Sequence, residues 1–235
     1  MMSHNEEYVV LTKEVIDTCL SDLGKLIKKH SNGQNVYCEL IVVGGASILL
    51  NYGFRLSTVD IDCSDEYKVL MNDLISLIAD KYRLPSNWIN TNFVNTKSYS
   101  PKLARCSTHY KTFGNGVLEV RTIRGVYLLA MKIVSARKYK NDYSDMFGII
   151  QEINKNSDLT MEMVDSAIIE LYDSIDVADK DAYRFVKSII DSPDIYSYEE
   201  LRKKESSNFE IAKSKSKETL NQEDIEYILS KLNIE

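Results

Sequence analysis

The sequence contains few histidines and no run of apolar residues long enough to cross a membrane. Only three histidines are present, at positions 4, 30 and 109, so histidine-based metal chemistry has little to use. Every apolar run is well short of the roughly 20 residues that a transmembrane helix needs, and no signal-peptide pattern precedes the first expected helix. These absences predict a cytoplasmic protein that has no membrane partner.

The sequence also lacks paired cysteines and an excess of positive charge. Its four cysteines are scattered and show no Cys-x-x-Cys spacing, so reduced thiols in a core are expected rather than disulfides or a zinc site. The formal net charge is −6, which argues against a protein that coats nucleic acid through bulk electrostatics. No Gly-x-Gly-x-x-Gly opens a helix after the first expected strand, and this excludes a dinucleotide-dependent enzyme.

The 235 residues are 44% hydrophobic, which is enough to form the cores of one or two globular domains. The most informative stretch is residues 38–63. A β-branched run, Glu39 to Val43, predicts a buried strand that ends at Gly44-Gly45. Ala46 to Tyr52 has helical spacing, and Gly53 is placed to stop the helix after about two turns.

A second strand is expected over Thr58 to Cys63. Its period of two puts Asp60 and Asp62 together on one face and the apolar residues on the other. Two adjacent carboxylates repel each other unless a cation lies between them, and hard oxygen ligands suit Mg²⁺ or Mn²⁺. The Gly44-Gly45 turn and the helix N-terminus provide N–H groups for phosphate, with the Ser47 hydroxyl as a further donor.

These residues resemble the nucleotidyltransferases of the DNA polymerase beta superfamily. The signature of that superfamily is a hydrophobic strand ending in Gly-Gly or Gly-Ser, a short helix, and Asp-x-Asp on the next strand. Here it stands as Val43-Gly44-Gly45-Ala46-Ser47, followed by Asp60-Ile61-Asp62. The resemblance implies an α/β (α+β) fold with a mixed sheet and flanking helices, and two Mg²⁺ ions held by Asp60 and Asp62.

The resemblance implies roles for two further residues. The superfamily often places a third catalytic carboxylate on a neighbouring strand, and Glu119 is the acidic residue of the expected strand Val117 to Ile123. The alternative, a solvated Glu119 beside Arg121, stays open. Arg55, just before the metal strand, is a candidate for binding phosphate.

A second motif resembles one branch of the superfamily, the AbiEii-like and related toxin-type nucleotidyltransferases. In that branch a helix carries Lys and Arg, and a Lys-Asp-x-x-Asp turn opens the next helix. The matching positions give Lys132 and Arg137 the role of binding nucleotide, and Asp142 or Asp145 the role of orienting one of them. In this chain the lysine and the first aspartate of that turn are not adjacent, because Asn141 separates Lys140 from Asp142. The alternatives are that Asp142 caps the helix starting at Tyr143 and that Arg137 is solvated.

The predicted organisation is a nucleotidyltransferase-fold domain over residues 1–145 and a helical C-terminal region over residues 146–235. The resemblance implies transfer of a nucleoside monophosphate from an NTP to a hydroxyl of RNA, including tRNA, or of a protein. It further implies the toxin of a toxin–antitoxin or phage-defence pair, with an antitoxin as partner. The alternative is a binding protein, an antitoxin or scaffold, that keeps the fold without the chemistry.

Overall fold

The computed structural model describes residues 9–31, 34–64 and 69–215, and it divides into two compact units. The first unit covers Met1–Arg124 and the second covers Gly125–Glu235. This boundary lies about 20 residues before the one expected at residue 145, because the helix after Arg124 packs with the helices that follow it. The two units are therefore described separately.

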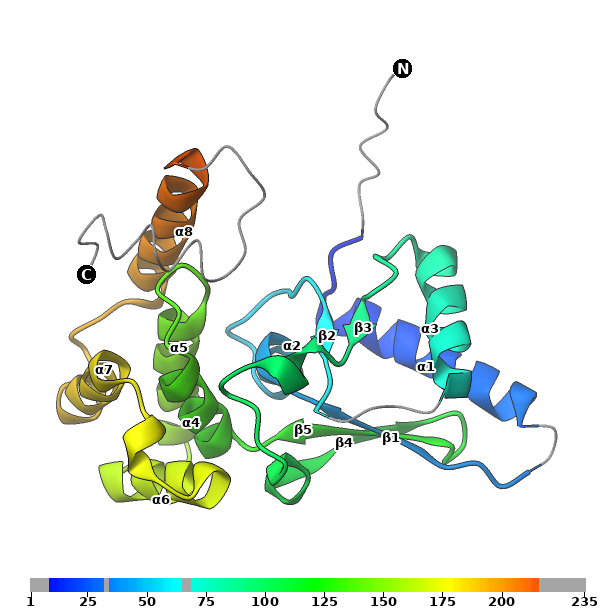
Figure 1. Cartoon of the computed structure of the whole chain (residues 1–235), viewed down its shortest axis with the longest axis horizontal. Helices are drawn as coiled ribbons and strands as arrows, with labels where there is room; N and C mark the ends of the chain where they lie inside the picture. The colour runs from blue at the N-terminus through cyan, green and yellow to red at the C-terminus, as the bar shows by residue number, and fades with distance from the viewer. Residues whose placement is uncertain (1–8, 32–33, 65–68, 216–235) are drawn as a thin grey trace. The chain divides into compact units, whose positions relative to one another are not determined.

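The helices of the first unit follow the predicted apolar patterns. Helix α1 (Lys13–His30) begins after Thr12, whose hydroxyl accepts a hydrogen bond from the Val15 N–H as an N-cap. Helix α2 (Gly44–Asn51) has about two turns, as expected. Helix α3 (Val69–Tyr82) lies beside α1, and both lie on the same side of the sheet (Figure 1). The sequence offers Ser64 or Asp65 as the cap of α3, and of these two Asp65 falls outside the described residues.

The sheet of the first unit is mixed. Strand β1 (Cys38–Val42) pairs in parallel with β5 (Leu118–Ile123), and β5 pairs antiparallel with β4 (Ser107–Phe113), giving the order β1-β5-β4. The β4–β5 hairpin turns at residues 114–116, all with positive φ, as the Gly-Asn-Gly sequence predicts.

Two short strands form a second, two-stranded sheet that an isolated bridge connects to the end of β1. Strands β2 (Ile61–Asp62) and β3 (Ile89–Asn90) pair in parallel, and an antiparallel bridge joins Val42 to Cys63. The second strand was expected over Thr58 to Cys63, but regular pairing begins only at Ile61. Val59 is consequently 81% exposed and does not join the buried face that the alternation predicted.

The core of the first unit lies between the sheet and its helices. It contains Ile16, Leu20 and Leu23 of α1, Leu40 and Val42 of β1, Leu118 and Val120 of β5, and Leu74 and Ile78 of α3. Trp88 is fully buried, and its indole N–H donates to the Ile75 carbonyl.

The segment 83–101, expected to be a loop or one short helix, instead carries β3 and a 3₁₀ turn (Asn92–Asn95). All four cysteines are buried.

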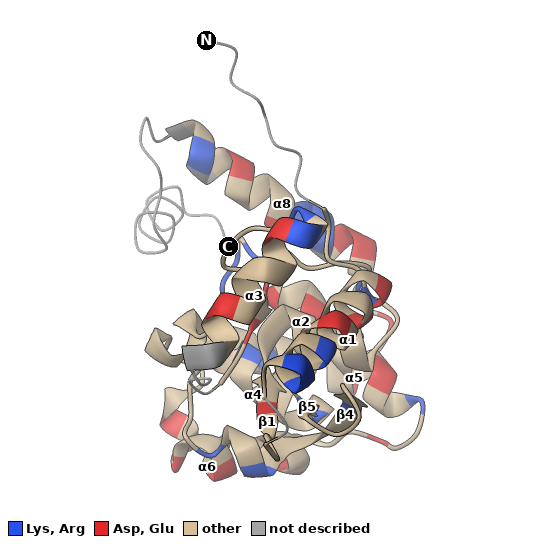
Figure 2. Ribbon diagram, turned by 90° about the vertical axis from the view of Figure 1, so that its right-hand side faces the viewer, with Lys and Arg blue, Asp and Glu red and all other residues tan. Residues whose placement is uncertain are grey.

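The second unit is helical in its described residues. The helices are α4 (Gly125–Ser135), α5 (Asp142–Asn154), α6 (Met161–Tyr172), α7 (Lys180–Asp191) and α8 (Tyr198–Lys215). The helical C-terminal region expected over residues 146–235 is therefore found as far as residue 215, and the residues after it fall outside the described part of the chain. Helix α8 carries both basic and acidic residues (Figure 2).

The α/β (α+β) fold class is thus confirmed: a mixed sheet with flanking helices, followed by a helical region. Among the helices that the structure describes, none combines the length and the apolar character needed to span a membrane.

Candidate functional site

The Gly-Gly turn lies where β1 ends and α2 begins. Val43 is extended, and Gly44 then takes a φ of +59°, a conformation that glycine adopts without steric cost. A Cβ on Gly44 would lie 3.5 Å from Asp62 Oδ2. The chain therefore brings the second carboxylate of Asp-x-Asp directly to the backbone of the turn.

Backbone pairing between β1 and β2 fixes this approach. The Val43 N–H donates to the Asp62 carbonyl at 2.9 Å, and the Ser64 N–H donates to the Ile41 carbonyl at 3.0 Å. These two bonds lie on either side of the Val42–Cys63 bridge. The position of Asp62 relative to Gly44 is therefore set by main-chain hydrogen bonds rather than by side-chain packing.

Arg55 lies against the second glycine of the turn. A Cβ on Gly45 would lie 2.6 Å from Arg55 Nη2 and 2.8 Å from its Cζ, so the guanidinium occupies space that a larger residue would take. The Arg55 Nε–H donates to the Ser57 carbonyl at 3.1 Å. The structure thus places a cation beside the N-terminus of α2, where the aligned peptide dipoles already favour anions.

Asp60 lies two residues before Asp62 and contacts β3. The Asn90 side-chain amide donates to Asp60 Oδ2 at 3.3 Å, and Asn90 is buried. Asn90 also accepts from the Asn92 N–H at 3.0 Å, which fixes its orientation. Sequence reasoning missed Asn90, since its only signal was its place in an asparagine-rich segment with no clear period.

The donor set at this turn fits a Mg²⁺ ion that takes its other ligands from water and phosphate. Asp60 and Asp62 are both half-buried. The described residues contain no group of three or more His, Cys, Asp or Glu side chains placed to hold a metal. Mg²⁺ is commonly bound by one or two carboxylates together with substrate phosphates, and glycine at 44 leaves room beside Asp62 Oδ2.

Ser47, expected to donate to phosphate, has a structural position instead. It is fully buried, and its Oγ accepts a hydrogen bond from the Ile123 N–H at 2.9 Å. The hydroxyl therefore ties α2 to the end of β5. A phosphate cannot reach it without displacing this packing.

Glu119 is not brought to the carboxylate pair. Along the parallel β1–β5 register, Glu119 lies opposite Glu39, whereas Val42, next to the turn, lies opposite Thr122. Glu119 is therefore three residues, roughly 10 Å, back along β5. Its carboxylate contacts Tyr37, His109 and Arg121, so the predicted alternative beside Arg121 describes its surroundings better.

The second motif assembles inside the second unit. Lys132 Nζ lies 2.7 Å from Asp142 Oδ1 and 2.8 Å from Asp145 Oδ2. The Arg137 guanidinium donates to Asp142 through Nε at 2.9 Å and Nη2 at 3.0 Å. Asp142 thus accepts hydrogen bonds from both cations, while the orienting role that the family motif implies for Asp142 or Asp145 stays a prediction. Asp142 lies in the first turn of α5 after the N-cap position Asn141, so it is not the cap itself.

The side chains of this ion-pair network are largely buried, which affects their charge states and their access to a ligand. The side chains of Asp142 and Asp145 are 0% exposed, that of Lys132 is 8% exposed and that of Arg137 is 21% exposed. Burial raises the pKa of Asp142, but Lys132 and Arg137 more than offset this, and the net pKa is lowered. The ammonium group of Lys132 is already engaged by two carboxylates, and phosphate binding by Lys132 and Arg137 stays a prediction.

Comparison with known proteins identifies the family. No curated protein and no solved structure matches the chain. Residues 19–220, which include the Gly-Gly turn, the Asp-x-Asp strand and the Lys132–Asp142 pair, match the family described as "Nucleotidyltransferase of unknown function (DUF6036)". The chain therefore belongs to this family of nucleotidyltransferases.

Proposed function

We propose that this protein transfers a nucleoside monophosphate from an NTP to a hydroxyl group of RNA or of a protein, with Mg²⁺ or Mn²⁺ as cofactor. The observation that carries the proposal is the approach of Asp62 to the Gly44 backbone, at the end of β1 where α2 begins. The N-terminus of α2 favours the negative charge of Asp62 and also that of a phosphate, but the two anions repel each other unless a cation lies between them. Asp60, next to it on the same short segment, adds a second oxygen donor.

In this reaction the hydroxyl oxygen of the acceptor attacks the α-phosphorus. The bond from the α-phosphorus to the bridging oxygen breaks, pyrophosphate leaves and the hydroxyl proton passes to solvent. Bound Mg²⁺ would lower the negative charge on the phosphates and on the attacking oxygen. Asp60 and Asp62 would hold the ion, while the Gly44-Gly45 turn and Arg55 would bind phosphate oxygens.

The test is transfer of label from each of the four α-³²P NTPs to total RNA and to total protein by the purified chain with Mg²⁺ or Mn²⁺. We expect one NTP to label one acceptor class, with an equal amount of pyrophosphate released. Asp60→Asn with Asp62→Asn is expected to abolish the transfer. Label transfer that persists in this double variant would place the chemistry elsewhere.

A second candidate function is a binding protein, an antitoxin or scaffold, that keeps the fold without catalysis. It is favoured by β5, because the residue opposite Val42 is Thr122, whose hydroxyl donates to Asn51 Oδ1. Strand β5 therefore provides no carboxylate beside the end of β1. NTP binding without label transfer, under all metal and acceptor conditions, would favour this function.

The biological setting proposed for the enzyme is that of the toxin of a toxin–antitoxin or phage-defence pair, close to the AbiEii-like branch. It is supported by the arrangement of Lys132, Arg137 and Asp142, which follows the motif of that branch except that Asn141 separates Lys140 from Asp142. Growth arrest on induction of the chain, relieved by Asp60→Asn with Asp62→Asn, is the expected outcome. Unimpaired growth with an enzymatically active chain would exclude the toxin role.

A further inference from the structure

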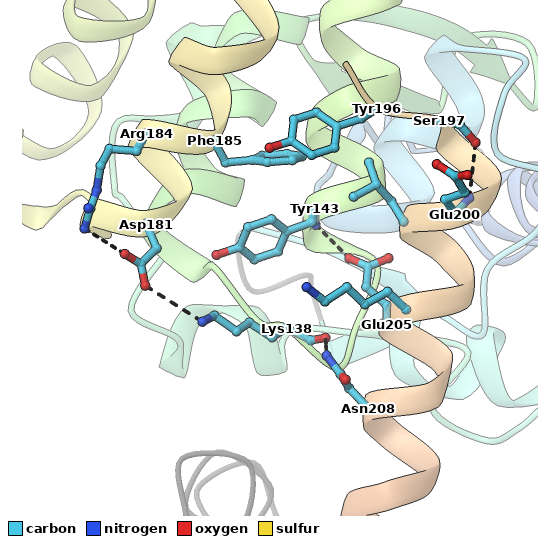
Figure 3. A pocket seen from close by; sticks show the side chains of 12 residues that line it. Lys138, Tyr143, Asp181, Arg184, Phe185, Tyr196, Ser197, Glu200, Glu205 and Asn208 are labelled. Atoms are coloured by element: carbon cyan, nitrogen blue, oxygen red, sulfur yellow. Dashed lines mark hydrogen bonds and ion pairs between the residues drawn. The ribbon is translucent and has the colours of Figure 1, made fainter. Parts of the chain in front are cut away.

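A pocket in the second unit has the size and lining of a small-molecule site. It lies between α5, α7 and α8 and has a volume of about 540 Å³ (Figure 3), within the 300–1,000 Å³ typical of ligand pockets. All of its lining residues belong to the helical unit. None of the lining residues belongs to the Gly-Gly turn or to the Asp-x-Asp strand, which are parts of the first unit.

Three aromatic rings form one wall of the pocket. The ring centroids of Tyr143 and Phe185 are 5.0 Å apart, and those of Phe185 and Tyr196 are 4.9 Å apart. The three side chains come from α5, α7 and the segment before α8, and all three are half-buried. Mutual packing holds the rings in place while part of their surface stays uncovered, which is the condition for a planar ligand to stack on them.

The hydroxyl of Tyr143 is a polar group that the described part of the chain leaves unsatisfied. Its oxygen is buried and has no hydrogen-bond partner among the described residues. Burial raises the pKa of Tyr143, with nearby acidic groups adding to the effect, so the hydroxyl keeps its proton and can donate it. A buried donor without a partner destabilises the folded state, and an acceptor atom of a ligand stacked nearby would remove that cost.

The charged residues of the lining leave one cation available. Asp181 is engaged by Arg184 at 2.9 Å and by Lys138 at 3.8 Å. Glu205 accepts from the Tyr143 N–H at 2.8 Å and from the Ser144 hydroxyl at 2.6 Å, so it is held at the N-terminus of α5. Lys204, in contrast, is exposed and makes no ion pair with any described residue. It is thus available to an anionic ligand.

We propose that this pocket binds a nucleotide unit, with its base on the Tyr143–Phe185–Tyr196 wall, an acceptor atom on Tyr143 Oη and its phosphate at Lys204. A ligand with a ring alone would leave Lys204 unused, and a simple phosphate would leave the aromatic wall unused. A nucleobase joined to phosphate uses both. Its source is either a free nucleotide or a nucleotide at the end of an RNA strand.

The experiment measures binding to the full-length chain by saturation-transfer NMR and calorimetry in EDTA, in the Asp60→Asn, Asp62→Asn background. These conditions suppress metal-dependent binding at the first unit, so neither the metal site nor turnover affects the result.

The probes are AMP, adenosine, ribose 5-phosphate and a single-stranded RNA hexamer ending in adenosine. We expect AMP to bind with saturation of its base protons, and adenosine and ribose 5-phosphate to bind at least 10-fold more weakly. Binding of the hexamer more tightly than AMP would identify an RNA end as the source, and the reverse order would identify a free nucleotide.

Two variants locate the site and two matched variants serve as controls. Tyr143→Phe and Lys204→Gln are each expected to weaken AMP binding by about 3- to 10-fold, the loss of one hydrogen bond or charged contact. Lys203→Gln, the exposed neighbour on α8, and Tyr183→Phe, whose hydroxyl donates to Asp165 instead, are expected to bind AMP as the parent does. Failure of AMP to bind, equal binding of ribose 5-phosphate, or unchanged binding in both Tyr143→Phe and Lys204→Gln would overturn the proposal. Lys204→Gln changes an exposed side chain, so its result stands even if Tyr143→Phe alters folding.

Discussion

The ammonium nitrogen of Lys132 lies 2.7 Å from Asp142 Oδ1, and both side chains are almost completely withdrawn from water. Asp145 contacts the same ammonium at 2.8 Å, and Arg137 contacts Asp142 from the other side. Removing one member of such a network is costlier than the net strength of the pair, because the remaining charges stay buried without compensation. The connection between α4 and α5 therefore depends on Lys132 for folding, whatever Lys132 does for catalysis.

Lys132→Ala is predicted to lower the free energy of unfolding by about 3–5 kcal/mol, since it leaves Asp142 and Asp145 buried with Arg137 as the nearest compensating cation. Lys155→Ala, which removes a 63% exposed lysine paired with Glu152, is expected to cost about 1 kcal/mol or less. Urea denaturation followed by circular dichroism measures both. A Lys132→Ala protein as stable as Lys155→Ala would contradict the structural role.

The catalytic role of Lys132 requires a separate measurement on folded protein. If Lys132 binds the triphosphate, label transfer per folded molecule falls by roughly one to three decades in Lys132→Ala. Normal transfer per folded molecule would restrict Lys132 to the ion-pair network. The measurement is made below the unfolding transition, with the folded fraction taken from the denaturation curve.

Gly44→Ala is predicted to destabilise the protein by about 1–2 kcal/mol, because an L-residue is strained at a φ of +59°. Gly53→Ala is the matched control: nothing lies within 4 Å of its added Cβ and its φ is not positive. We expect Gly53→Ala to be neutral, or to stabilise by up to about 1 kcal/mol through the unfolded state. Thermal unfolding of the parent and of both variants tests this prediction. Equal melting temperatures for Gly44→Ala and Gly53→Ala would contradict the backbone strain expected at position 44.

The helices were predictable because their signals are local. The apolar stripe of α1 and its Thr12 cap, for example, lie within a few residues of each other. Strand β3 was not predictable, because two residues cannot show a period, and β2 is shorter than the strand expected over Thr58 to Cys63. They form through contacts distant in sequence: the Ile61 N–H donates to the Trp88 carbonyl and the Cys63 N–H donates to the Asn90 carbonyl.

The same distinction between local signals and contacts distant in sequence applies to the candidate site. The proximity of Gly44 and Asp62 could be predicted, since both belong to one strand–helix–strand motif. The position of Glu119 could not, because it depends on the register between β1 and β5, and a shift of a few residues would move it to the other end. The burial of Ser47 likewise depends on the Ile123 N–H, 76 residues away.

Glu205 is predicted to make stability depend on pH between about 4.5 and 7. Burial raises its pKa from 4.5 to about 7, against the hydrogen bonds from Ser144 and the backbone and with a smaller contribution from Asp145. The folded state therefore binds more protons than the unfolded state in this window, and the free energy of unfolding falls as pH rises through it. Glu205→Gln keeps the shape and should remove this part of the slope, so the variant gains stability over the parent above pH 7. Equal slopes for parent and variant would show that Glu205 titrates normally.

The metal site is tested by the melting temperature in the presence of Mg²⁺ and a non-hydrolysable NTP analogue. A ligand that binds only the native state at about 100 times its Kd stabilises by about 2.7 kcal/mol, so the parent should melt at a clearly higher temperature with both ligands than with either alone. Asp60→Asn with Asp62→Asn removes both oxygen donors at the turn and should abolish the joint shift. Asp73→Asn with Asp80→Asn makes the same change of charge at two exposed positions on α3 and should keep it. A joint shift that survives in the Asp60, Asp62 variant would mean that the ion binds at other residues, and the assignment of Asp60 and Asp62 as its ligands would fail. Equal loss of the shift in both variants would mean that the ion binds through long-range charge.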